Sequence, residues 1–244
     1  MGCGCVGPAK DSKDKYSIEN ILNDKIQEPK EISSNLPITE YVKKVFFLIN
    51  RVRLNPSEFV SAIETAEKCI KVINGRKIFD DNKIKVSLNE GKKMFHDCAD
   101  YLRKLQPMEE LNFCDDIVLE CPKDEHKIKD INFFKQQLIS KKEKFGIEAY
   151  FKDSIRIPEI SVLLMLVDDS VKNPRKKRET LLNPKYKFIG ISSSDTNSIT
   201  LENDKNKINN ELNDENNNIK RTNEIEKKIN NPKNKSFCAY FTLK

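Results

Sequence analysis

The chain has 244 residues, and its 44 basic and 38 acidic residues give a formal net charge of +6. This length suffices to bury one sizeable hydrophobic core. Its longest apolar run, residues 160–167, is far shorter than the roughly 20 residues that cross a bilayer, so we expect no membrane-spanning helix. The modest net charge permits contact with anionic lipid or nucleic acid and indicates neither. Seven scattered cysteines and no apolar leader predict reduced thiols inside the cell.

The chain begins Met-Gly-Cys-Gly-Cys, a pattern typical of lipid-modified proteins. Gly2 supplies the amine that N-myristoylation requires, although Val6 stands where that motif usually has Ser or Thr. Cys3 and Cys5 offer thiols for palmitate, and two acyl chains anchor a protein stably where one does not. We therefore expect a lipoprotein on the cytoplasmic face of a membrane, with membrane lipid as a partner. The alternative that stays open is a disordered N-terminal segment whose cysteines are incidental and carry no lipid.

Residues 8–37 are polar and mixed in charge, which predicts a flexible tether behind the anchor. Residues 1–37 are thus expected to be an anchor-and-tether segment, and residues 38–244 one folded domain. Within that domain, residues 197–235 contain 13 asparagines among 39 residues. Such a segment cannot bury enough apolar surface to offset its ordering entropy. We expect it to be a disordered insertion in a hairpin.

The first half of the domain predicts helices around one hairpin. Thr39 is a good N-cap for a helix that ends at Asn55-Pro56. A second helix is expected to run to Gly75 as its C-terminal stop. Residues 77–86 predict a short hairpin, and residues 89–106 another amphipathic helix.

The second half predicts one long helix, one central helix and three strands. Residues 115–144 favour a helix that Pro122 kinks or divides and Gly146 closes. Pro158 suits the first turn of a helix that is apolar on every side and therefore buried. Strands are expected at residues 147–151, 187–192 and 237–243.

Three segments carry a family resemblance. Residues 49–59 read INRVRLNPSEF, residues 89–91 read NEG ahead of a Leu102–Pro107 and Leu111 pattern, and residues 166–191 contain VDDSV, RKKR and LLNPKYKFIGI. In this order they resemble the motifs of the CAP superfamily, the cysteine-rich secretory, antigen 5 and pathogenesis-related-1 proteins, whose domain is also called the SCP domain. The likeness covers residues 38–196 and the last strand. It implies an α+β fold, an α-β-α sandwich with a central antiparallel sheet.

The resemblance also implies a cleft, and here the chain departs from the family. CAP domains typically line this cleft with two histidines and two acidic residues that bind a divalent cation in some members. Lys177 stands where one histidine is expected, while His126 and Glu148 match other family positions. A lysine ammonium removes a ligand and repels a cation, and we expect it to pair with Glu148. These three residues therefore predict a degenerate cleft with no metal and no cofactor.

Other uses of the reactive side chains are weaker. Cys114, Cys121 and His126 are spaced unlike a zinc knuckle or finger. The basic run at residues 172–178 would suit a nuclear signal or a phosphate-binding patch, whereas the family resemblance implies a structural turn, which we favour. Without aromatic stacking residues we expect no nucleic-acid partner. The leading hypothesis is a membrane-tethered, non-catalytic CAP-like domain that binds a protein or lipid partner. The alternative is a protease- or esterase-type hydrolase that uses the degenerate cleft.

Overall fold

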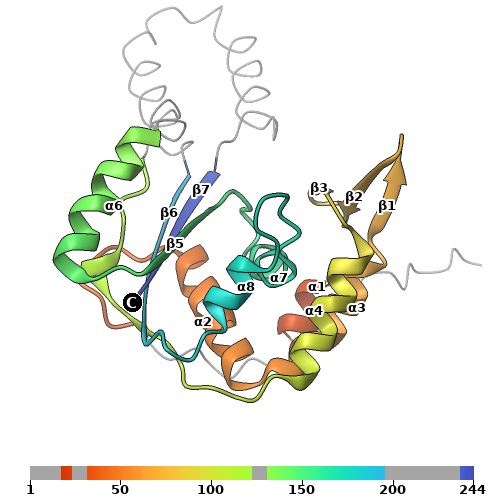
Figure 1. Cartoon of the computed structure of the whole chain (residues 1–244), viewed down its shortest axis with the longest axis horizontal. Coiled ribbons are helices and arrows are strands. Elements are labelled where there is room, and N and C mark those ends of the chain that lie inside the picture. Colours follow the sequence, from red (N-terminus) through yellow and green to blue (C-terminus); the bar gives the residue numbers. More distant parts are fainter. Residues whose placement is uncertain (1–17, 24–31, 123–130, 196–236) are drawn as a thin grey trace, which may run out of the picture. The chain divides into compact units, whose positions relative to one another are not determined.

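The computed structural model describes residues 18–23, 32–122, 131–195 and 237–244, which fold into an α+β protein of two compact units (Figure 1). Unit 1 contains residues 18–23, 48–108 and 162–182. Unit 2 contains residues 32–47, 109–122, 131–161, 183–195 and 237–244. Helices α2 (Glu40–Leu54) and α7 (Pro158–Val167) each contribute residues to both units. No helix in the described part of the chain has the length and apolarity needed to cross a membrane.

Unit 1 is built mainly from helices. Besides the ends of α2 and α7 it contains α1 (Ile18–Asn23), the 3₁₀ turn η2 (Pro56–Phe59), α3 (Val60–Glu67), α4 (Lys92–Lys104) and α8 (Lys176–Leu181). Helix α4 buries the apolar face that its sequence predicts, formed by Met94, Phe95, Cys98 and Leu102. The predicted break after Asn55 is confirmed, because Pro56 opens η2 there.

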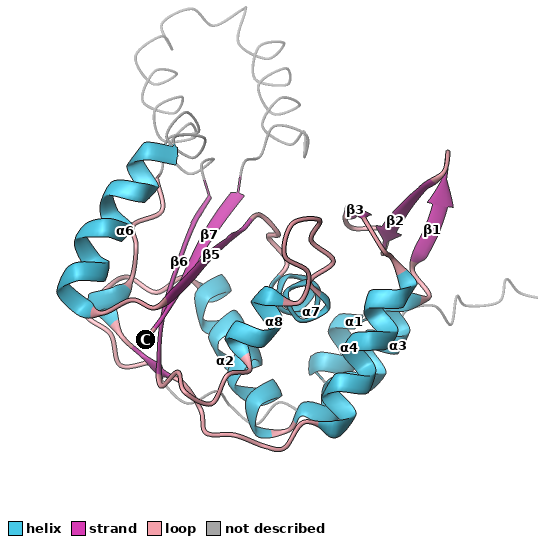
Figure 2. Cartoon of the chain, in the orientation of Figure 1, coloured by secondary structure: helices cyan, strands magenta, loops and turns pink. Residues whose placement is uncertain are grey.

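A three-stranded antiparallel sheet completes unit 1, in the order β1 (Ile70–Ile73), β2 (Arg76–Asp80), β3 (Lys85–Leu88) (Figure 2). The predicted β2–β3 hairpin is confirmed. The predicted extension of the second helix to Gly75 is wrong. Asn74 and Gly75 have φ angles of 49° and 73° and form the tight turn between β1 and β2, the geometry that an Asn-Gly pair favours.

Helix α1 corrects the prediction of an entirely flexible tether. Its residues Ile18 and Leu22 are 5% and 1% exposed, so they belong to the hydrophobic core of unit 1. The Arg51 guanidinium donates a hydrogen bond to the Leu22 carbonyl, which satisfies a backbone group at the end of this helix. The sequence prediction missed this helix because only three apolar residues in a polar segment mark it, namely Ile18, Ile21 and Leu22.

Unit 2 is organised around a four-stranded sheet in the order β4 (Asn112–Phe113), β6 (Phe188–Asp195), β7 (Phe237–Leu243), β5 (Ala149–Asp153). Three of these strands match the predictions. Strands β6 and β7 pair along their length as an antiparallel hairpin with Asp195 opposite Phe237. The predicted insertion at residues 197–235 therefore connects two paired strands, although the insertion lies outside the described residues. The sheet is mixed, because β4 runs parallel to β6.

The two faces of this sheet contact different helices (Figure 1). Tyr240 of β7 packs against Phe134 of helix α6 (Ile131–Phe145), with ring centroids 4.7 Å apart. Phe237 lies three residues earlier and so faces the opposite side, where Tyr41 of α2 contacts it at a centroid distance of 4.7 Å. The sheet of unit 2 is thus covered on one face by α6 and on the other by the first part of α2.

The prediction of a helix from residue 115 is wrong for residues 118–122. After a short 3₁₀ turn, η3 (Asp115–Ile117), the chain continues without helical structure (Figure 2). Thr242 Oγ1 donates to the Ile117 carbonyl at 2.6 Å, and Ser192 Oγ donates to the Leu119 carbonyl. Side chains of the sheet therefore satisfy backbone groups that a helix would otherwise pair internally. Gly146, with φ of +71°, ends α6 as predicted.

Candidate functional site

The segments that carry the CAP resemblance contact one another within unit 1. Arg53 is fully buried, and its Nη1 donates to the Leu181 carbonyl at 2.7 Å. This bond joins the INRVRLNP segment to the start of the LLNPKYKFIGI segment. A buried guanidinium needs such acceptors, since an unpaired one carries a large desolvation cost.

Two adjacent carboxylates organise two different loops. Asp169 accepts backbone N–H bonds from Asn89, Glu90 and Gly91 at 2.9, 2.9 and 2.8 Å. Asp168 accepts the backbone N–H of Lys177 at 2.8 Å, and burial raises the pKa of its carboxyl group. The aspartate pair therefore holds the start of α4 and the start of α8, which gives this pair a structural role.

The basic run behaves as the predicted structural turn. Arg178 is 2% exposed, forms an ion pair with Asp97 and lies over the Tyr101 ring at 5.0 Å from its centroid. The neighbouring Arg175 pairs with the same carboxylate at 2.8 Å but is about half-exposed. These contacts direct both guanidinium groups toward α4.

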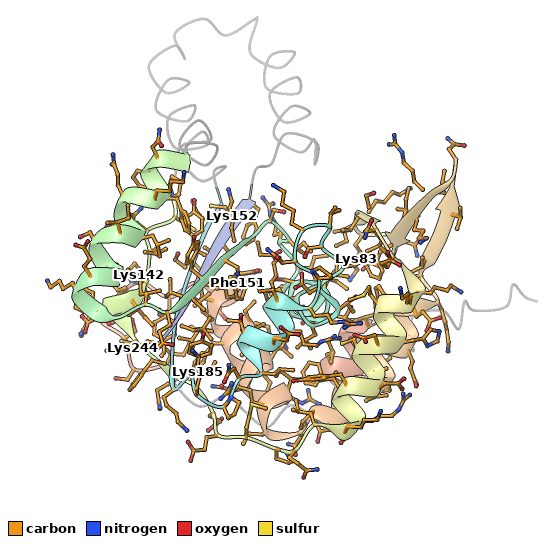
Figure 3. All side chains as sticks on the ribbon, in the orientation of Figure 1. Lys83, Lys142, Phe151, Lys152, Lys185 and Lys244 are labelled. Atoms are coloured by element: carbon orange, nitrogen blue, oxygen red, sulfur yellow. The ribbon has the colours of Figure 1, made fainter. Side chains whose placement is uncertain are left out.

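The residues of the predicted cleft are only partly described. His126 lies outside the described residues. The carboxylate of Glu148 is exposed and forms an ion pair with Lys185 at 2.6 Å, and Lys185 is labelled in Figure 3. This pair raises the pKa of Lys185 through its hydrogen bond to Glu148. Lys177 belongs to the other compact unit, so its expected pairing with Glu148 stays a prediction.

The other predicted sites have mixed outcomes. Gly2, Cys3 and Cys5 lie outside the described residues. No group of three or more metal-ligating side chains occurs in the described part of the chain. The weak candidate zinc site of Cys114, Cys121 and His126 stays a prediction, because His126 lies outside the described residues. His96 on α4 is exposed, and its Nε2 lies 3.3 Å from a carboxylate oxygen of Glu67.

Unit 2 contains a cavity of about 590 Å³. Its wall is mainly apolar and includes Leu36, Ile38, Val42, Val118, Leu119 and Ile191. Thr39 and Ser193, which are hydrogen-bonded to each other at 2.8 Å, add hydroxyl groups. A volume of this size and an apolar wall with a few polar groups are typical of small-molecule sites.

A thiol pair lies at the wall of this cavity. The Sγ atoms of Cys121 and Cys238 are 3.4 Å apart, and the Ser192 hydroxyl lies 3.5 Å from the Cys121 sulfur. Cys121 lines the cavity and is half-buried, whereas Cys238 is fully buried. The five described cysteines are all free thiols.

A hydroxyl chain lies elsewhere in unit 2. Ser161 donates to Asp153 Oδ2 at 2.6 Å, and its Oγ lies 2.9 Å from the Tyr41 hydroxyl. Burial, followed by the Asp153 charge, raises the pKa of Tyr41, so this phenol stays protonated and donates to Ser161. Both hydrogen-bonding functions of the buried serine are therefore used within the chain.

The sequence missed the cavity and the thiol pair. The cysteines are 117 positions apart, and the cavity wall combines residues from four separate stretches of the chain. No short pattern could have joined them. The sequence indicated the Asp168-Asp169 pair only as part of a family motif and gave no sign of the loops that it holds. Comparison with protein-family models, with curated proteins and with solved structures gave no match.

Proposed function

We propose that this protein is a lipid-anchored, CAP-like binding protein that acts at the cytoplasmic face of a membrane through a protein or lipid ligand. Myristate on Gly2 and palmitate on Cys3 and Cys5 would hold the chain there. The observation that carries the binding part is the apolar cavity of unit 2, about 590 Å³ in volume.

The fold assignment within this proposal has two supports. Unit 2 has helices on both faces of its sheet, as an α-β-α sandwich requires. In unit 1 the motif residues hold one another, with Arg53 bonded to Leu181 and Asp169 bonded to residues 89–91. Both observations favour a CAP-like domain.

A binding role is favoured over hydrolysis by the surroundings of the described candidates. Glu148 is exposed and held by Lys185, and Ser161 is buried and saturated with hydrogen bonds. A general acid or base must reach the proton that it transfers, and a nucleophile must reach the reacting atom. The Glu148 carboxylate is engaged by the Lys185 ammonium, and the Ser161 hydroxyl is buried, so neither group is set up for this chemistry.

The anchor is tested by metabolic labelling with alkyne analogues of myristate and palmitate. The wild type should carry both labels and sediment with membranes. Gly2→Ala should lose the myristate label, and the double variant Cys3→Ser/Cys5→Ser the palmitate label. Cys69→Ser is the control, since this thiol lies in the folded part of unit 1. Absence of both labels from a wild type that stays in the supernatant refutes the anchor.

The cavity is tested with a dye whose fluorescence rises in apolar surroundings. Ile38→Trp places a bulky ring in the cavity wall and should reduce dye binding at least about tenfold. Val171→Trp is the control, because Val171 is 79% exposed in unit 1. Equal dye binding by the two variants would refute the cavity as the binding site.

Hydrolysis is the outcome that would replace this proposal. The purified wild type is assayed with peptide and ester substrates beside His126→Ala and Glu148→Gln. Glu109→Gln is the matched control, because Glu109 is also exposed and paired with a lysine, Lys187. Turnover that His126→Ala or Glu148→Gln abolishes, and Glu109→Gln keeps, would identify a hydrolase.

A further inference from the structure

The thiols of Cys121 and Cys238 are close enough to react with each other. Their sulfur atoms are 3.4 Å apart, and a disulfide bond is about 2.05 Å long, so the two atoms need to approach by about 1.4 Å. Cys238 stands on β7, a strand paired on both sides and therefore held firmly. Cys121 stands in the segment without helical structure, whose position is set by side-chain bonds to its carbonyl groups. The movement that brings the two sulfur atoms within bonding distance is therefore expected in the segment that carries Cys121 and not in β7.

The segment and the sheet meet in a regular register that ends at the thiol pair. Thr242 donates to the Ile117 carbonyl, and Ser192, the cross-strand partner of Tyr240, donates to the Leu119 carbonyl. Two residues further along the segment, Cys121 meets Cys238. The segment thus meets β7 at the levels of Thr242, Tyr240 and Cys238, which are two residues apart and lie on the same face of the strand. This regular spacing places Cys121 beside Cys238. Their proximity is therefore a consequence of the packing of unit 2.

The electrostatic surroundings shift the pKa values of the two thiols in opposite directions. The hydrogen bond with Cys121 lowers the pKa of the Cys238 thiol, and the positive charge of Lys152 acts in the same direction. The same hydrogen bond, together with burial, raises the pKa of Cys121. Lys152 stands on β5 beside β7, opposite Tyr240 (Figure 3). When the pair loses one proton, the charge is thus held at Cys238 while Cys121 keeps its proton.

Access comes from the cavity. Cys121 lines the cavity, while Cys238 lies behind it and is fully buried. A small peroxide reaches Cys121 first, and its neighbour supplies the base. This arrangement places an accessible thiol beside a buried second thiol that also serves as the base.

We propose that Cys121 and Cys238 are a redox modification site, which hydrogen peroxide converts into an intramolecular disulfide. The Cys121 sulfur attacks one peroxide oxygen and the O–O bond breaks, as the Cys121 proton passes to the Cys238 thiolate. The departing hydroxide becomes water by taking up a proton from the solvent, which replaces the one that Cys238 released when it ionised. The product is a Cys121 sulfenic acid. The Cys238 sulfur then attacks the Cys121 sulfur, the S–S bond forms, and the hydroxyl leaves with the Cys238 proton as a second water. Two thiols and one peroxide thus give one disulfide and two waters.

The test uses the purified full-length chain, reduced and then treated with hydrogen peroxide. Remaining thiols are alkylated, and disulfide-linked peptides are identified by mass spectrometry. The Cys121–Cys238 peptide pair should be the main product and form at least about tenfold faster than Cys98 or Cys114 is oxidised. Dominant linkage between other cysteines, or equal oxidation of Cys98 and Cys114, would overturn the proposal. The wild type alone decides this, so no variant has to fold.

Variants then test the order of the steps. Cys238→Ala removes both the base and the second thiol. Cys121 should therefore react more slowly with peroxide in this variant, but its sulfenic acid should persist and be labelled by a sulfenic-acid reagent, unlike in the wild type. Cys114→Ser is the control and should still form the bond, since Cys114 lies directly before η3 and is also half-buried. Oxidation should also raise the unfolding temperature of the wild type, because the new bond closes a loop between residues 117 positions apart. Cys238→Ala without label at Cys121, even after the longer peroxide treatment that the missing base requires, would contradict the proposed order.

Discussion

The carboxylate of Asp169 offers the sharpest test of how unit 1 is held together. It accepts three backbone N–H bonds from residues 89–91, directly before helix α4 begins at Lys92. The N–H groups of the first helical turn, and of the residues just before it, have no partners within the helix. A negative charge at the N-terminal end of a helix also interacts favourably with the helix dipole. Asp169 thus acts as a cap supplied from a distant part of the chain. We predict that Asp169→Ala lowers the stability of the protein.

The size of this effect follows from the number and exposure of the bonds. A hydrogen bond to a charged group contributes about 1.5–3 kcal/mol. Three bonds at the lower limit would give about 4.5 kcal/mol, and water can replace part of this because Asn89 is exposed. We therefore expect a loss of about 3 kcal/mol in the free energy of unfolding, or about 6–12 °C in unfolding temperature for a chain of this size.

The assay is chemical and thermal unfolding followed by circular dichroism, with two comparison variants. Asp169→Asn keeps one carbonyl acceptor and should lose about half as much stability as Asp169→Ala. Asp100→Ala removes an exposed partner of Arg103 on helix α4 and should cost less than about 0.5 kcal/mol. If Asp169→Ala is no less stable than Asp100→Ala, the three bonds do not cap the helix as argued.

Three further predictions concern other contacts of the fold. Gly190→Ala should destabilise by about 2 kcal/mol, since a Cβ there would lie 2.8 Å from a backbone carbon. Arg178→Ala should cost about 3 kcal/mol, because it leaves Asp97 without its buried partner, whereas Arg175→Ala at the same carboxylate should cost less than about 1 kcal/mol. Asp80→Asn should destabilise at pH 7, and this difference should disappear as the pH falls below the ordinary aspartate pKa of 3.8.

The sign of the Asp80 effect follows from its surroundings. A hydrogen bond from Lys71 is the main cause of its lowered pKa, and Lys85 adds to it. Since the folded state prefers the carboxylate, its contribution is full above the unfolded pKa and is lost as the pH falls through the folded value. A pH-independent difference would contradict this account.

For Gly190 the control is Gly75→Ala, where a Cβ meets no atom within 4 Å and only the positive φ is unfavourable.

Local signals predicted a good part of the fold. The helix that follows Thr39 begins as expected, and the Thr39 hydroxyl accepts the Val42 N–H at 3.2 Å. Pro158 opens α7, whose apolar residues are buried except for the half-buried Leu164, and β7 runs over the predicted residues. In each case one strong local preference agreed with the burial pattern.

Where two local signals competed, the sequence prediction failed. Asn74-Gly75 is a hairpin signal, but the helical spacing that ends at Ile70 suggested a longer helix. Residues 117–119 are three consecutive apolar residues, which fit neither a helix face nor an alternating strand, and all three are buried. Their structure depends on hydroxyl groups of β6 and β7 that no local pattern reveals.

The candidate sites depended still more on distant residues. Asp169 binds backbone groups about 80 positions away, and Cys121 meets a thiol 117 positions away. Such contacts arise only when the chain is folded, and a single sequence does not record them. The sequence did indicate that Arg175 and Arg178 have structural roles, and their contacts with Asp97 confirm this.

The pairing of Asp195 with Phe237 has a practical consequence for the 41 positions between them, residues 196–236. The backbones on either side are held at the separation of neighbouring strands, about 5 Å, which a two-residue turn can span. Exchanging these positions for Asn-Gly would give a shortened chain whose sheet register is unchanged. Conversely, a folded reporter whose own termini lie close together could be grafted between β6 and β7. The end of this hairpin is therefore a natural exchange point at which the chain can be shortened or extended without redesigning the sheet.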